Sequence, residues 1–283
     1  MRHSRSYRLS VISLLLSFAI LMGIDMLPAQ VTLAPSMLFI DSRSGVGSLY
    51  IGNNSTLPQE VSISFMFGYP DADSAGNIKM KYDDSLAAKT YSLNPMIHAY
   101  PRSFLLNPKQ EQTVRLQVGT KSSVKDVFLF TRVKVTSAQK SPDIEKKPTD
   151  SITTQISFKF DQILPIFYRK GNVSTGLTIH DVSTAFKDTT LTVVADVERM
   201  GIAPFIGSVK AELYSSSNER VALSEATAAI YFRVKNKMEL GLSKARNGKY
   251  RLVLTYETKR ADVAAENLLQ TSPVTKEVTV DIQ

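Results

Sequence analysis

The stretch from Ser151 to Lys170, SITTQISFKFDQILPIFYRK, constrains the fold of this chain more than any other. The large apolar residues Ile156, Phe158 and Phe160 alternate here with polar ones, so in an extended strand they share one face. A strand with such a face either contributes to the core of a sandwich or serves as a template for another chain. The rest of the sequence bears on which of these two uses applies.

The N-terminal segment predicts export. Basic residues are followed by the apolar run Val11 to Ile24 and then by the small residue Ala29, an order typical of a signal peptide. The run is shorter than the ~20 residues of a spanning helix. We therefore expect a signal peptide over 1–29 and a mature chain from Gln30 without stable membrane insertion, the alternative being a retained anchor. The chain has no cysteine, so its core rather than disulfides has to stabilise the exported protein.

Short β-type runs separated by Gly, Asn, Asp and Pro follow one another along the rest of the chain. This pattern of short strands and turns predicts an all-β protein with two immunoglobulin-like β-sandwich domains in tandem. The division is expected within Arg169 to Asn172, where an apolar strand passes into charge and glycine. The predicted domains are 30–169 and 170–283.

Three segments outside the strands have their own predictions. Ser137 to Asp150 is polar and contains two prolines, which indicates a mobile loop between neighbouring strands. Asn247 and Gly248 are typical of a tight hairpin turn. Residues Ala261 to Asn267 form either one helical turn or a bridge between the last two strands.

Catalytic and cofactor chemistry finds little support in the residue types. The histidine candidates, His98 and His180, lie in ordinary strand or loop settings without a nucleophile beside them. No cluster has metal-ligand spacing, and no glycine-rich phosphate loop is present, so no cofactor is expected. The net charge of +8 is spread over the chain and fits acidic partners better than nucleic acid. These observations favour binding over catalysis.

Three segments, in order, resemble one known family, the PapD-like periplasmic chaperones of pilus (fimbrial) assembly. MLFIDSRSGVGSLYIGNNS is similar to the family's first two strands. PRSFLLNPKQEQTVRLQV is similar to its proline turn and the strand that follows. FLFTRVKV, a polar loop and ILPIFYRK are similar to the last two strands of its first domain.

The resemblance implies a non-enzymatic periplasmic protein whose last first-domain strand completes the sheet of a pilus subunit, by donor-strand complementation. It places four residues of this chain on the subunit-binding donor strand: Ile156, Phe158, Phe160 and Leu164. It also implies an outer-membrane usher as the second partner, a role in fimbrium biogenesis and cell wall organization, and a divergent branch of the family.

This chain departs from the family at the cationic pair that grips a subunit's terminal carboxylate. Met37 and Pro165 stand at those positions, and neither side chain binds a carboxylate. Cations that could replace the pair are Arg102, Arg132, Lys134, Arg169 and Lys170. Arg169 and Lys170 at the hinge, with Arg102 on a nearby loop, are the candidate carboxylate anchor.

Two other functions remain open at this point. One is an envelope structural or adhesion module, in which the apolar face of the strand serves only its own domain. The other is a secreted hydrolase with its site between the domains. Pro165 favours an edge strand, because proline in the middle of a sheet would lose a ladder hydrogen bond.

Overall fold

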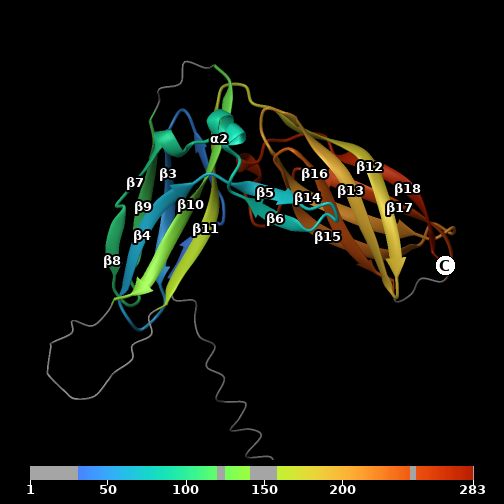
Figure 1. The fold of residues 1–283 in the computed structure, drawn as a ribbon, viewed down its shortest axis with the longest axis horizontal. Helices are drawn as coiled ribbons and strands as arrows, with labels where there is room; N and C mark the ends of the chain where they lie inside the picture. Colours follow the sequence, from blue (N-terminus) through green and yellow to red (C-terminus); the bar gives the residue numbers. More distant parts are fainter. Residues whose placement is uncertain (1–30, 120–124, 141–157, 243–246, 283) are drawn as a thin grey trace, which may run out of the picture.

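The computed structural model describes residues 31–119, 125–140, 158–242 and 247–282, which form two β-sandwiches that meet at an angle (Figure 1). The predicted class, all-β with two sandwich domains in tandem, is confirmed. The predicted signal peptide and the candidate Ile156 lie outside the described residues.

The first sandwich has sheets of order β1-β3-β9-β7 and β2-β11-β10-β4-β8. All pairs are antiparallel except β2 with β11, which run parallel. Its strands are β1 (Val31–Ala34), β2 (Leu38–Asp41), β3 (Val46–Asn53), β4 (Gln59–Met66), β7 (Ile97–Tyr100), β8 (Ser103–Leu106), β9 (Glu111–Val118), β10 (Val127–Gln139) and β11 (Lys159–Lys170).

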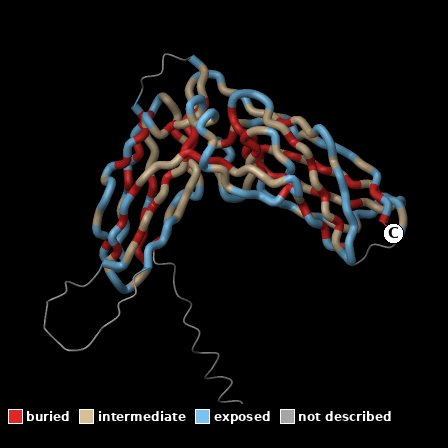
Figure 2. Tube along the Cα trace, viewed as in Figure 1, coloured by how far each residue is buried: buried red, intermediate tan, exposed pale blue. Residues whose placement is uncertain are grey.

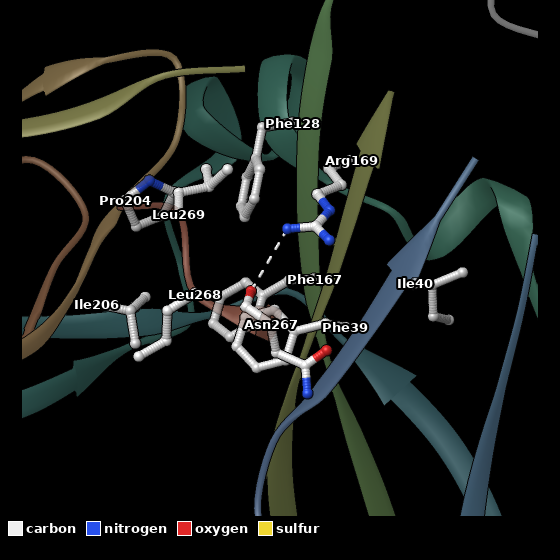
Figure 3. Close-up of a pocket in the computed structure, with 10 residues that line it drawn as sticks. All are labelled: Phe39, Ile40, Phe128, Phe167, Arg169, Pro204, Ile206, Asn267, Leu268 and Leu269. Carbon is white, nitrogen blue, oxygen red and sulfur yellow. Dashed lines mark hydrogen bonds between the residues drawn. The ribbon is translucent and has the colours of Figure 1, made fainter. Parts of the chain in front are cut away.

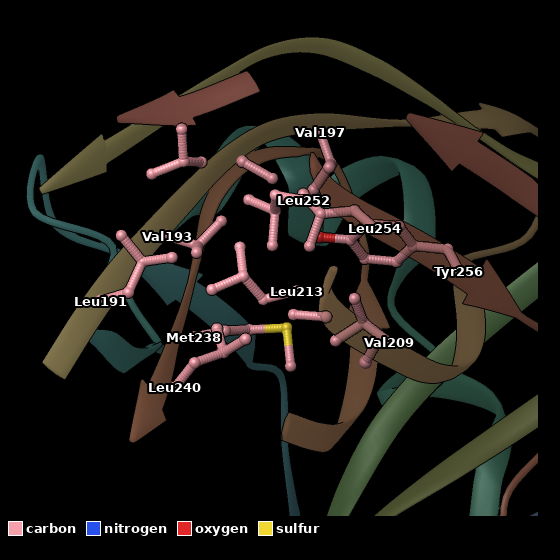
Figure 4. Close-up of a cluster of buried hydrophobic side chains, with 14 of the residues drawn as sticks. Leu191, Val193, Val197, Val209, Leu213, Met238, Leu240, Leu252, Leu254 and Tyr256 are labelled. Atoms are coloured by element: carbon pink, nitrogen blue, oxygen red, sulfur yellow. The ribbon is translucent and has the colours of Figure 1, made fainter. Parts of the chain in front are cut away.

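The second sandwich has sheets of order β12-β13-β16 and β15-β14-β17-β18. Leucine, valine and aromatic side chains at alternate positions of both sheets fill its core (Figure 4). Its strands are β12 (Thr175–Lys187), β13 (Thr190–Gly201), β14 (Phe205–Tyr214), β15 (Arg220–Ile230), β16 (Arg233–Gly241), β17 (Gly248–Glu257) and β18 (Val274–Ile282).

A hairpin and short helices stand outside the two sandwiches. The hairpin of β5 (Tyr69–Ala72) and β6 (Ile78–Lys81) leaves the first sandwich and reaches toward β16 of the second (Figure 1). Helix α2 (Ser85–Tyr91) follows it, and the 3-10 turns η1 (Asn94–Met96) and η2 (Ala265–Asn267) come later. No helix was predicted at the position of α2. Its N-cap is Asp84, whose carboxylate accepts a hydrogen bond from the Ala87 N–H.

A buried aromatic cluster, here called the joint, connects the two sandwiches, and Figure 2 shows the buried chain running through this region. The first sandwich contributes aromatic side chains from β5, β10 and β11, and the second contributes Tyr231 and aliphatic residues. Tyr231 packs with its ring centroid 4.8 Å from that of Phe130. The guanidinium of Arg199 lies 5.2 Å from the ring centroids of both Tyr91 and Phe232. The buried members are Phe67, Tyr69, Phe128, Phe130, Phe167, Ala203, Ile206, Tyr231 and Leu268.

The chain passes from the first sandwich to the second between Lys170 and Thr175. Gly171 there has φ of +73°, and a Cβ on it would lie 2.3 Å from the carbonyl oxygen of Lys125. The backbone N–H of Asn172 donates to the Asp126 carboxylate at 2.7 Å. Only glycine fits this turn without a backbone shift.

One prediction about loops is wrong at its start, and another is wrong altogether. Strand β10 continues to Gln139, so the first residues of the predicted mobile loop, Ser137 to Gln139, pair with β4 instead; residues 141–157 lie outside the described part. Asn247 and Gly248 do not form a tight hairpin, because β17 pairs with β14 and β18 while β16 belongs to the other sheet. For Ala261 to Asn267 both expectations apply: the segment links β17 to β18 and includes the turn η2.

Candidate functional site

Strand β11 has one half that is open on one side. It pairs with β10 from Lys159 to Lys170, whereas β2 covers its other side only from Ile166 to Arg169. Within the described residues, the segment Lys159–Pro165 therefore has no strand on the side away from β10. We call this side the open edge, and its backbone groups can pair with an incoming strand.

The described candidate donor residues are Phe160 and Leu164, on one face of this open half, and Phe158, which directly precedes the strand. Phe158 and Phe160 are 64% and 45% exposed, with ring centroids 6.5 Å apart. Leu164 lies on the same face by strand alternation, but it is half-buried and packs against the first core. The two phenylalanines are thus free to contact a partner, while Leu164 also serves its own domain.

Sequence reasoning passed over the polar member of this face, Gln162. Its side-chain Nε2 donates to the carbonyl oxygen of Val31, 2.9 Å away, at the start of β1 in the opposite sheet. We call Phe158, Phe160, Gln162 and Leu164 together the donor face. The sequence signal was present, because Gln162 interrupts the apolar alternation.

Charged residues occupy the other face of the open half. The Asp161 carboxylate accepts hydrogen bonds from Thr136 Oγ1 at 2.5 Å and from Lys134 Nζ at 3.3 Å, both on β10. The Thr136 hydrogen bond, with help from Lys134, lowers the pKa of Asp161 below its ordinary value. Lys159 is also exposed on this face. Such charges keep an exposed strand from pairing indiscriminately.

Pro165 marks the boundary of the open edge. It is the last residue before β2 begins to cover β11, and it stands opposite Arg132 on β10. Proline has no backbone N–H to donate, so it is tolerated where no strand covers the neighbouring segment. This position agrees with the edge strand that Pro165 favoured in the sequence.

The three candidate anchor cations are not brought together. Arg169 Nε lies 3.5 Å from the Asp41 carboxylate, and its Nη1 donates to the Asn267 carbonyl at 3.5 Å (Figure 3). Lys170 is the next residue at the end of β11. Arg102 precedes β8, and in the sheet β4 and β10 lie between β8 and β11. Arg169 therefore links the two domains. Arg102 lies toward the opposite edge of the sheet, next to β8.

The pocket beside Arg169 has no room for a ligand. Its cavity is about 10 Å³, enough for one water molecule at most. Figure 3 shows aromatic and aliphatic side chains of both domains around it, among them Phe128, Phe167 and Leu268. It belongs to the joint.

A second pair of cations lies near the buried Tyr231. Burial raises the pKa of the Tyr231 hydroxyl, and the positive charges of Arg132 on β10 and Arg260 in the second domain oppose this rise. Arg132 Nε donates to the Gly68 carbonyl at 3.3 Å, and Arg260 forms an ion pair with Asp262 at 2.6 Å. Nothing in the sequence pattern placed Arg132 and Arg260 around the same tyrosine, because Tyr231 belongs to the joint.

The two candidate histidines lie in different domains. His98 is on β7, and His180 on β12 has its Nε2 2.7 Å from the Glu198 carboxylate. Among the described residues there is no group of three or more His, Asp and Glu that could hold a metal ion. No described helix has the length and apolar character needed to cross a membrane.

The described geometry thus defines a two-domain β-sandwich protein whose strand β11 has an open edge and a largely apolar donor face. No protein-family model matches this chain, and no curated protein matches it. Among solved structures it is similar to the YadV chaperone, with 11% identity and a TM-score of 0.44, covering 88% of this chain and 100% of that one. It is also similar to the class 5 fimbriae chaperone CfaA, with 12% identity and a TM-score of 0.42 over 87% of this chain and 98% of that one. A third likeness is to a chain in the complex of the Salmonella enterica SafA pilin with the SafB chaperone, with 12% identity and a TM-score of 0.41 over 88% and 96% of the two chains.

Proposed function

We propose that this protein is a non-enzymatic periplasmic chaperone that holds pilus or fimbrial subunits by donor-strand complementation. The open edge carries the proposal, because it combines unpaired backbone at Lys159–Pro165 with the exposed rings of Phe158 and Phe160. A subunit that lacks its last strand exposes both core and unpaired backbone. The open edge would supply the missing hydrogen bonds and the missing apolar side chains together.

The expected strength of binding fits a chaperone that later releases its client. Each large apolar side chain that becomes fully buried contributes about 1.5–3 kcal/mol before the entropic cost of association. Phe158 and Phe160 are more than a third exposed and have most of this contribution available, whereas Leu164 has already used part of it in its own core. Together, the contributions of these side chains are sufficient for reversible capture of a subunit.

Export to the periplasm and delivery to an outer-membrane usher belong to the same proposal. Export rests on the N-terminal sequence pattern, and the usher step rests on the family resemblance. Arg169 is a weaker candidate for the carboxylate anchor than the sequence suggested, since it already contacts Asp41 and Asn267.

The test is capture of a subunit encoded in the same gene cluster, by co-expression in the periplasm and pull-down. The variant Phe158→Asp/Phe160→Asp should remain folded by circular dichroism and lose the subunit. Its matched control is Met200→Asp/Leu223→Asp, which changes two side chains of the second sandwich that are 52% and 49% exposed. The control should keep the subunit.

An envelope structural or adhesion module is the alternative. It predicts that the folded donor-face variant keeps its partner or that the wild-type protein captures no subunit. Either result would exclude the chaperone proposal.

A further inference from the structure

We propose that Gln162 sets the register in which a client strand pairs with the open edge. This inference rests on the proposed function and adds a property of the client: its groove carries a hydrogen-bonding group opposite Gln162. The first observation is the composition of the donor face, which reads Phe158, Phe160, Gln162 and Leu164 in chain order.

An alternating apolar face alone does not fix register well. Moving one strand by one residue turns its side chains to the wrong face, but moving it by two restores the face. In such a shift Phe160 takes the place of Phe158, and one phenylalanine replaces the other. A two-residue shift that moves Gln162, in contrast, places a polar side chain where an apolar one belongs.

The second observation is the position of the Gln162 amide. The amide reaches from β11 to the Val31 carbonyl of β1 in the opposite sheet. It lies on the side of the first sandwich that β2 leaves uncovered. An incoming strand beside Lys159–Pro165 would run along this side. The amide is half-buried and points toward the opposite sheet, as the apolar members of the face do.

The cost of a wrong register follows from hydrogen bonding. In the correct register Gln162 keeps its bond to Val31, and the other hydrogen-bonding atoms of its amide pair with a polar group of the client. In a register shifted by two residues, these atoms would enter a groove position that otherwise receives a phenylalanine. Buried amide atoms without a partner weaken binding by about tenfold or more. A buried asparagine fixes the register of coiled coils by the same physics.

Disulfide mapping tests the inference directly, because the chain has no cysteine of its own. The exposed Lys159 is replaced by cysteine, and the captured subunit of the same gene cluster carries single cysteines along the strand that flanks its groove. Disulfide formation needs Cβ atoms about 3.5–4.5 Å apart, so the yield reports register. The wild-type face should give one preferred position.

Two variants then separate register from stability. Gln162→Leu should keep capturing the subunit but give a second crosslinked position two residues from the first. The exchange Phe160→Gln/Gln162→Phe should move the preferred position by two residues or abolish capture while Gln162→Leu retains it. Thermal unfolding checks that both variants fold, since both lose the bond to Val31.

The outcomes distinguish this inference from the function on which it rests. If both variants capture the subunit at the wild-type position alone, Gln162 does not set the register, and the chaperone proposal stands. If the wild-type protein captures no subunit, both fall together.

Discussion

The two halves of β11 differ both in their residues and in their surroundings. From Ile166 onward β2 covers the strand, and Ile166, Phe167 and Tyr168 are each at most 1% exposed. Before Ile166 the strand is open, and the exposed fraction rises to 64% at Phe158. One strand therefore anchors the domains with a continuous apolar run and presents an alternating half to solvent, which teaches that burial along β11 follows its residues and the strand beside it together.

The difference in burial between the two halves is tested most directly by replacing one phenylalanine in each half. Phe167 is 1% exposed and packs on Phe39 with ring centroids 5.0 Å apart, so Phe167→Ala should lower the free energy of unfolding by about 3–5 kcal/mol. Phe160→Ala should lower it by about 1 kcal/mol or less, because Phe160 is 45% exposed. Urea unfolding followed by circular dichroism measures both. Equal losses would mean that Phe160 is buried in the free protein.

A second prediction concerns the turn that ends the anchored half. Gly171→Ala should cost about 1–3 kcal/mol of stability, because the new Cβ would collide with backbone at φ of +73°. The matched control is Gly241→Ala, where a Cβ meets nothing within 4 Å and which should change stability little. Thermal unfolding of the two variants gives the comparison. A neutral Gly171→Ala would show that the connection between the domains shifts at little cost.

Much of the open half could be predicted from the sequence, and most of the joint could not. The alternation of Phe158 and Phe160 with charged residues is a local pattern, and it identified the exposed face. The open edge itself depends on where β2 begins, at Leu38 beside Ile166, which no local pattern within β11 encodes.

One sequence feature could have indicated the joint but was not used in the prediction. Phe128, Leu129 and Phe130 are consecutive and all buried, because the phenylalanines face the second domain while Leu129 faces the first core. A continuous apolar run in a strand indicates burial on both faces. Which surface covers the outer face, and that the β5–β6 hairpin and α2 take part, depends on contacts between distant segments.

The smallest expected effect is a dependence on pH that differs in origin between the two halves. In the open half, the hydrogen bond from Thr136 lowers the pKa of Asp161. In the anchored half, the pKa of Asp41 is lowered first by the backbone N–H of Arg43, with a contribution from the charge of Arg169. A carboxyl group whose pKa is lower in the folded state stabilises the fold above its unfolded pKa, about 4, and this contribution is lost as the pH falls through the folded pKa.

Asp161→Asn and Asp41→Asn should therefore each be less stable than the wild type at about pH 6, and each difference should vanish toward about pH 3. Urea unfolding across this range measures the two differences. Binding of a client adds a further distinction, because a strand on the open edge would surround Asp161 and leave Asp41 under β2. With the subunit bound, the Asp161→Asn difference should change, because burial penalises the charged carboxylate, while that of Asp41→Asn stays the same. An equal change in both would mean that the client also reaches the anchored half, and that the boundary at Pro165 does not limit its contact.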